Sequence, residues 1–188
     1  MSDITWVEPI VCASENGTAL TNSTTATSLL PASAKEILAA AFFKKLGRQF
    51  RVRAAGRIST VVTTPGTLTL DFRLGSVNVF TSGAMALNTV AKTNVTWEYE
   101  AVLSLRAIGS GTSAAFLGIG KFSSEAVIGS PLPSAGGSGM LLLPASAPAN
   151  GTGFDGTAAQ QVDFYGTWSV ANASNSIQLH QFELIAVN

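Results

Sequence analysis

The sequence predicts an all-β protein, an antiparallel β-sandwich or jelly roll with one short helix and an extended N-terminal arm. Apolar and polar residues alternate over long stretches, most clearly across residues 49–105, which is the period of a strand with one buried face. Turn residues such as Pro65-Gly66 recur at short intervals, and strands joined by short turns pair antiparallel. So many strands cannot share one sheet with an apolar face, so two packed sheets are expected.

The length of 188 residues favours a single domain with a substantial core. We expect residues 1–30 to form the N-terminal arm and edge strands, with a turn at Asn16-Gly17 between strands over residues 9–13 and from Thr18. Residues 31–188 are expected to form the jelly roll itself. The Thr-rich arm needs a strand partner, which could belong to the same subunit or to a neighbouring one.

One helix is predicted, over residues 33–46. Ser33 and Glu36 have the spacing of a capping box, apolar residues recur at helical intervals after them, and Gly47 suits the position just past a helix end. Such a short helix would need to pack against the sheet to be stable.

The remaining elements are predicted as strands and one long loop. The first five strands are expected at residues 49–62, 67–75, 77–87, 94–108 and 114–122. Residues 129–156 are rich in Pro and Gly and are predicted to be a long loop containing one short strand, Met140–Leu143. Two more strands close the chain, and the apolar parity of the last one changes at His180-Gln181, which predicts a β-bulge.

The charge content argues against two classes of partner. Eleven basic and eleven acidic residues give a formal net charge of zero, and charged residues make up 12% of the chain, about half of the usual ~25%. A nucleic-acid partner is not expected, because that needs a basic surface. A membrane partner is not expected, because no apolar run approaches ~20 residues. Weak charge repulsion favours self-association instead.

No catalytic, cofactor or metal site is predicted. Cys12 is the only cysteine and His180 the only histidine, so metal-ligand spacing is absent and no internal disulfide is possible. The glycine-rich stretches at 118–120 and 136–139 lack the Lys-Ser/Thr that follows a phosphate-binding loop. We interpret His180 as a structural residue.

The candidate subunit interface consists of charged residues on two predicted strands. Glu98 and Glu100 share one face of their strand at about 6–7 Å spacing, which is within the range of a glycosidase carboxylate pair. The interpretation that we prefer is that they meet a basic row on another strand or on a neighbouring subunit. That row is Arg51, Arg53 and Arg57.

Several runs resemble the jelly-roll structural proteins of tailed bacteriophages over about the first two-thirds of the chain. Asn16-Gly17-Thr18 and Leu29-Leu30-Pro31 resemble elements that precede the first strand run in that group. The runs that carry the resemblance are 46–60 (LGRQFRVRAAGRIST), 64–75 (TPGTLTLDFRLG), 97–100 (WEYE) and 103–109 (LSLRAIG).

The resemblance implies a non-enzymatic virion protein, most plausibly a head decoration or cement protein on the capsid surface, assembled in the host cytoplasm. Its partners would be further copies of itself, commonly as a homotrimer, and the major capsid protein. An alternative is a minor tail or receptor-binding protein that binds carbohydrate through exposed aromatics such as Trp97, Tyr165 or Trp168. A third possibility is a carbohydrate-active enzyme that uses Glu98 and Glu100.

Overall fold

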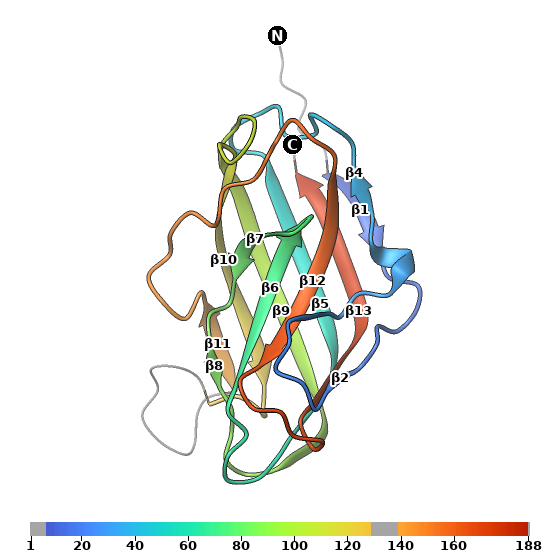
Figure 1. The fold of residues 1–188 in the computed structure, drawn as a ribbon, viewed down its shortest axis with the longest axis vertical. Coiled ribbons are helices and arrows are strands. Elements are labelled where there is room, and N and C mark those ends of the chain that lie inside the picture. Colours follow the sequence, from blue (N-terminus) through green and yellow to red (C-terminus); the bar gives the residue numbers. More distant parts are fainter. Residues whose placement is uncertain (1–6, 129–138, 188) are drawn as a thin grey trace.

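The computed structural model describes residues 7–128 and 139–187, which form two antiparallel sheets packed face to face (Figure 1). The first sheet has seven strands in the order β1-β13-β5-β9-β10-β11, with β2 also paired to β13. Its strands are β1 (Val7–Cys12), β2 (Leu20–Thr21), β5 (Gln49–Thr60), β9 (Lys92–Ala107), β10 (Ala115–Ser124), β11 (Met140–Leu143) and β13 (Ser176–Val187).

The second sheet has six strands in the order β3-β12-β6-β7, with β4 also paired to β12 and β8 to β6. Its strands are β3 (Thr27–Ser28), β4 (Ile37–Leu38), β6 (Thr67–Leu74), β7 (Val77–Thr81), β8 (Met85–Ala86) and β12 (Gln160–Trp168). The order β1-β13-β5-β9 opposite β3-β12-β6-β7 is that of a jelly roll, because the chain crosses repeatedly between the sheets. The predicted fold class is confirmed, and β10 and β11 extend the first sheet beyond it.

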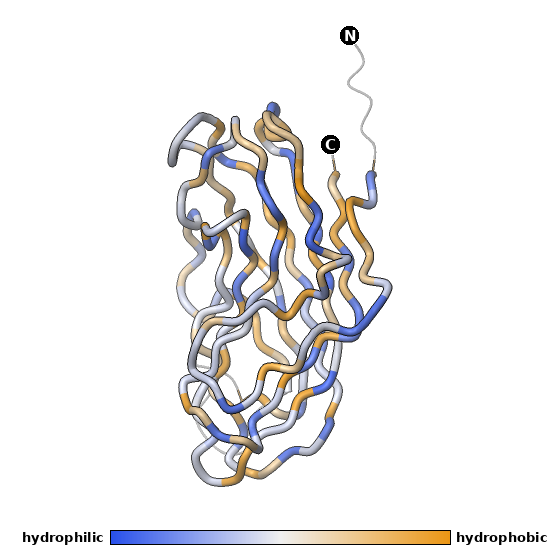
Figure 2. Tube along the Cα trace, turned by 45° about the vertical axis from the view of Figure 1, so that its right-hand side comes forward, coloured by the Kyte–Doolittle hydropathy of each residue, from blue (hydrophilic) through white to orange (hydrophobic). Residues whose placement is uncertain are grey.

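The core lies between the two sheets and is built by the alternation seen in the sequence (Figure 2). On β5 the residues Phe50, Val52, Ala54 and Ile58 are buried while the arginines between them are exposed. The bulkiest fully buried side chains are aromatic, including Trp97, Trp168, Tyr99, Phe50 and Phe116. Each such side chain contributes on the order of 1.5–3 kcal/mol of burial free energy.

The predicted helix over residues 33–46 is wrong. A single 3-10 turn covers Ala32–Ala34, and β4 then pairs Ile37 and Leu38 with Gln161 and Gln160 of β12. The segment that follows is irregular, and Ala41 has a φ of 57°, outside the right-handed helical region. Strand pairing to β12 and burial of Phe43 outweigh the helical propensity of this stretch.

The N-terminal residues find their strand partners in the same subunit. β1 and β2 pair with β13, and β3 pairs with β12. Leu20 and Leu29 are buried in the core, and Trp168 donates its indole N–H to the carbonyl of Leu20 at 3.3 Å. Residues 7–30 are therefore edge strands of both sheets, and residues 1–6 of the predicted arm lie outside the described residues.

Two local predictions on the later strands are confirmed and one needs correction. β11 spans Met140–Leu143 as predicted, and the pairing of β13 with β5 shifts register between Leu179 and Gln181, which is the expected bulge. The single strand expected over residues 77–87 is broken into β7 and β8 at Ser82-Gly83, where the Ser82 hydroxyl accepts from the Leu70 N–H. Residues 129–138 of the predicted loop lie outside the described part of the chain.

The last part of the predicted loop, from residue 144 onward, runs back along the sandwich. It forms isolated bridges from Asn150 to Leu117 and from Phe154 to Ala114 of the β10 region. Phe154 is fully buried and stacks on Phe116 at 5.5 Å between ring centroids.

Among the described residues no helix has the length and apolar character needed to cross a membrane.

Candidate subunit interface on the outer face of the seven-stranded sheet

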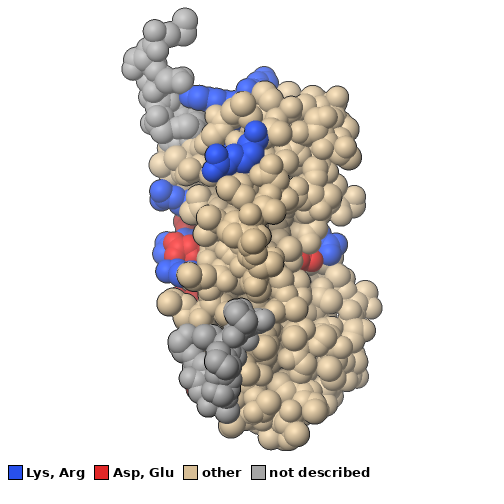
Figure 3. Space-filling view, turned by 90° about the vertical axis from the view of Figure 1, so that its left-hand side faces the viewer, with Lys and Arg blue, Asp and Glu red and all other residues tan. Residues whose placement is uncertain are grey.

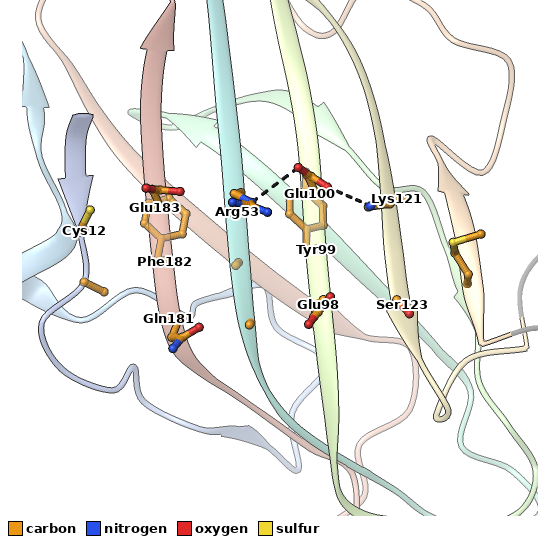
Figure 4. Close-up of a pocket in the computed structure, with 14 residues that line it drawn as sticks. Cys12, Arg53, Glu98, Tyr99, Glu100, Lys121, Ser123, Gln181, Phe182 and Glu183 are labelled. Carbon is orange, nitrogen blue, oxygen red and sulfur yellow. Dashed lines mark ion pairs between the residues drawn. The ribbon is translucent and has the colours of Figure 1, made fainter. Parts of the chain in front are cut away.

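Four charged side chains form a row across the outer face of the seven-stranded sheet. Strand register places Lys121 of β10 opposite Glu100 of β9, Glu100 opposite Arg53 of β5, and Arg53 opposite Glu183 of β13. The row therefore alternates in sign from strand to strand (Figure 4). We call these four residues the charged row.

Direct ion pairs hold the middle of the charged row. Glu100 lies 3.0 Å from the Lys121 ammonium and 3.6 Å from the Arg53 guanidinium. The Lys121 hydrogen bond is the largest cause of a lowered pKa at Glu100. Partial burial opposes it, and the positive charges of Lys121, Arg53 and Arg51 lower the pKa further. These side chains are 40–63% exposed, so each pair adds little to folding stability.

A groove of about 610 Å³ runs beside the charged row. Its other wall is a parallel row of Ser123, Glu98, Ala55 and Gln181 in register on the same four strands. The short side chain of Ala55 leaves room between its longer neighbours. Among the described residues Glu98 makes no hydrogen bond or ion pair, so its carboxylate is open to a partner.

One of the predicted ion pairs between β5 and β9 forms in the structure. Arg53 meets Glu100 as expected. Arg57 instead donates to the Asn94 carbonyl at 3.1 Å and to Thr96 Oγ1 at 2.8 Å. Arg51 lies opposite Val102 and acts on Glu100 only through its charge.

Sequence reasoning missed Lys121 and Glu183. Both lie on predicted strands with outward parity, which marks them as surface residues. Their alignment with Arg53 and Glu100 depends on the register between strands, which the alternation within each strand does not specify.

The electrostatics of Glu100 do not suit the proton donor of a glycosidase. A glycosidase needs one carboxylic acid whose pKa is raised so that it can donate a proton. Glu100 shows the opposite, because Lys121 and Arg53 stabilise its ionised form and lower its pKa. The arrangement therefore suits a surface that presents fixed charges.

The aromatic residues named for carbohydrate binding do not form an exposed platform. Trp97 and Trp168 are 0% and 1% exposed and belong to the core. Tyr165 is half-buried, and the Arg73 guanidinium covers its ring at 4.0 Å from the centroid. Stacking of a sugar ring needs an open aromatic face, and none of these three provides one.

The single cysteine and single histidine stand apart from any ligand cluster. Cys12 is exposed at the end of β1, and His180 Nδ1 lies 2.8 Å from Asn16 Oδ1 at the bulge. No group of three or more His, Cys, Asp or Glu side chains that could hold a metal occurs within residues 7–128 and 139–187.

A second charged cluster lies on the outer face of the other sheet and is mostly buried. Asp163 is 5% exposed, accepts hydrogen bonds from Ser28 Oγ at 2.5 Å and from the Phe164 N–H at 2.8 Å, and pairs with Lys35 at 3.0 Å. This network ties the N-terminal segment to β12. We assign it a structural role.

Replacing Lys121 with methionine should raise the pKa of Glu100 toward the ordinary glutamate value of about 4.3. The substitution removes the hydrogen bond that contributes most to the lowered pKa. Because the folded-state pKa is depressed, the stabilisation from the pair is present above the ordinary pKa and disappears as pH falls through the folded value. NMR titration of the Glu100 carboxyl measures the change.

The matched control for this titration is Lys92→Met. Lys92 is the first residue of β9 and pairs with Glu125 at 3.1 Å. It should leave the pKa of Glu100 unaltered. Equal titration curves for wild type and Lys121→Met would mean that the Lys121–Glu100 contact does not form in solution.

No protein-family model matches the chain, and no curated protein matches it.

Proposed function

We propose that this chain is a non-enzymatic virion structural protein that self-associates and decorates or cements a phage capsid. The observation that carries the proposal is the outer face of the seven-stranded sheet, where the charged row lies next to exposed apolar side chains such as Ile119 and Val102. The four charges of the row alternate in sign from strand to strand. The jelly-roll topology and the resemblance of the strand runs to phage structural proteins support the same assignment.

The low surface charge supports a role in which the protein is covered by other protein. Figure 3 shows a face on which uncharged residues dominate, with acidic and basic side chains gathered in small groups. Several large apolar side chains are exposed, among them Leu142 at 74%, Ile119 at 53% and Leu46 at 56%. Such surfaces are stabilised by contact with a lattice or with further copies. Each contact needs only modest affinity, because repetition over many sites supplies avidity.

The proposed partners are the major capsid protein and further copies of this chain, with a homotrimer as the form that the resemblance implies. Location on the head surface distinguishes this proposal from a tail or receptor-binding role. The buried positions of Trp97 and Trp168 give the carbohydrate-binding alternative no support.

The test is the copy number of the chain in purified particles, measured by quantitative mass spectrometry against the major shell protein. Hundreds of copies per particle are expected if the chain covers the capsid lattice. A handful of copies would move the chain to the tail or a fibre, and its absence from particles would contradict the virion role.

A further inference from the structure

We propose that the outer face of the seven-stranded sheet packs against the same face of a second copy, about a two-fold axis parallel to the strands and between β5 and β9. This inference goes beyond the proposed virion role, because it concerns two copies of the chain in solution and does not need a capsid. It commits to one partner, the chain itself.

The signs in the charged row select this geometry. Across β10, β9, β5 and β13 the row reads plus, minus, plus, minus, as Lys121, Glu100, Arg53 and Glu183 (Figure 4). A two-fold axis parallel to the strands reverses the order of the row in the second copy. Lys121 then faces Glu183 of the second copy and Glu100 faces Arg53, so that all four positions meet the opposite charge.

The other in-plane axis gives the opposite result. A two-fold axis along the charged row would place Lys121 on Lys121 and Glu100 on Glu100 of the second copy. Like charges brought together in an interface oppose association. The charged row is therefore complementary to itself in one face-to-face orientation and repulsive in the other.

The axis that the charges select also passes through the middle of the sheet. In the order β1-β13-β5-β9-β10-β11 three strands lie on either side of the boundary between β5 and β9. The two-fold would therefore place β9 over β5, β10 over β13 and β11 over β1 of the second copy. Two sheets can pack face to face in this way at about 10 Å, and the charged row and the edges of the sheet would then coincide in both copies.

Apolar residues next to the charged row fit the same arrangement. The neighbouring row holds Ile119, Val102, Arg51 and Ile185 on the same four strands. Ile119 is 53% and Val102 36% exposed, although both are large apolar side chains. The proposed axis places Ile119 over Ile185 of the second copy, and Val102 over the aliphatic stem of Arg51. The contact would thus exclude water from apolar surface as well as pair charges.

Two single charge reversals test the geometry, Lys121→Glu and Glu183→Lys. Each reversal places like charges opposite each other at positions 121 and 183, and the two-fold axis makes this happen twice in one dimer. The apparent dissociation constant of the dimer should therefore rise by about tenfold or more. Sedimentation equilibrium measures it, and circular dichroism checks that each variant is folded. The wild-type chain should form even-numbered species, a dimer, or a hexamer if the trimer also forms.

The decisive sample is an equimolar mixture of the two variants. Glu at position 121 of one variant faces Lys at 183 of the other, while the native Glu183 faces the native Lys121, so mixing should restore association to within about threefold of wild type. Positions 121 and 183 lie three strands apart in one chain, about 14 Å by strand spacing. Recovery on mixing therefore reports a contact between copies.

The matched control is Glu36→Lys, the same kind of charge reversal on an exposed residue beside β4. β4 pairs with β12 of the six-stranded sheet, so Glu36 lies outside the proposed contact face, and its reversal should leave association unchanged. A wild-type chain that sediments only as a monomer or a trimer overturns the inference, and so does a mixture that stays dissociated. Neither result bears on the copy number that tests the virion role.

Discussion

Replacing Phe43 with alanine should lower the free energy of unfolding by about 3–5 kcal/mol, the usual cost of emptying a buried aromatic site. Phe43 is 4% exposed and contacts three buried rings edge to face, those of Phe50, Phe116 and Phe154, at centroid distances of 5.7, 5.6 and 5.0 Å. It joins the segment before β5 to the seven-stranded sheet and to the segment before β12. No neighbouring group can fill the space without moving one of these elements.

Urea unfolding followed by tryptophan fluorescence measures the effect as a shift of the midpoint. Leu46→Ala is the matched control, because Leu46 belongs to the same irregular segment and is 56% exposed. We expect it to change stability by no more than about 0.5 kcal/mol. If both variants lost the same small amount, the ring of Phe43 would not be the anchor of this segment.

The segment over residues 33–46 shows why a local sequence pattern predicted a helix that does not form. Ser33 and Glu36 have the spacing of a capping box, but the Ser33 hydroxyl donates to Glu15 Oε1 at 2.6 Å, and the Glu36 carbonyl accepts from the Val162 N–H at 2.8 Å. Both partners are distant in sequence. Capping residues and apolar periodicity indicate the structure that a segment favours in isolation. In this segment, contacts with residues distant in sequence override that preference.

The long strands were predictable because their evidence is local. Alternation on β5, β6 and β9 requires only that one face of each strand is buried, and the bulge near His180 followed from a change of parity within one strand. Edge strands as short as β3 and β8 have too few residues to show a period.

The candidate site was predictable only in part, since it depends on how strands align with one another. The sequence identified Arg53 and Glu100 as outward charges, and the structure pairs them. The prediction also placed Arg51, Arg57 and Glu98 in the same interface. These three residues lie in other rows, and within the described part of the chain they form no ion pair. A charged row across four strands depends on the register of three strand pairs. The alternation within a single strand specifies none of these registers.

Replacing Gly118 with valine should destabilise the protein by about 1–3 kcal/mol through overpacking. Gly118 lies on the inner face of β10, and a Cβ there would overlap the Phe80 ring and come within 2.6 Å of Leu103 Cδ2. Phe80 reaches this space from β7 of the other sheet. The glycine thus makes room for an aromatic ring between the sheets, and its effect should depend on that ring.

A double-mutant cycle with Phe80→Ala isolates this dependence. Phe80→Ala alone should cost about 3–5 kcal/mol, because it leaves a cavity. In the double variant the valine occupies part of that cavity, so the combined loss should be smaller than the sum of the two single losses by about 1 kcal/mol or more. Chemical unfolding of the four proteins gives the coupling free energy.

Gly118→Val combined with Ile177→Ala provides the control cycle. Ile177 is fully buried near the start of β13, where it pairs with Ile58, whereas Gly118 lies at the level of Leu103 and Phe50, toward the other end of β5. These two losses should add within about 0.5 kcal/mol. If the cycle with Phe80 were additive as well, the ring of β7 would not occupy the space above Gly118. The two sheets would then be in contact through other residues at this level of the sandwich.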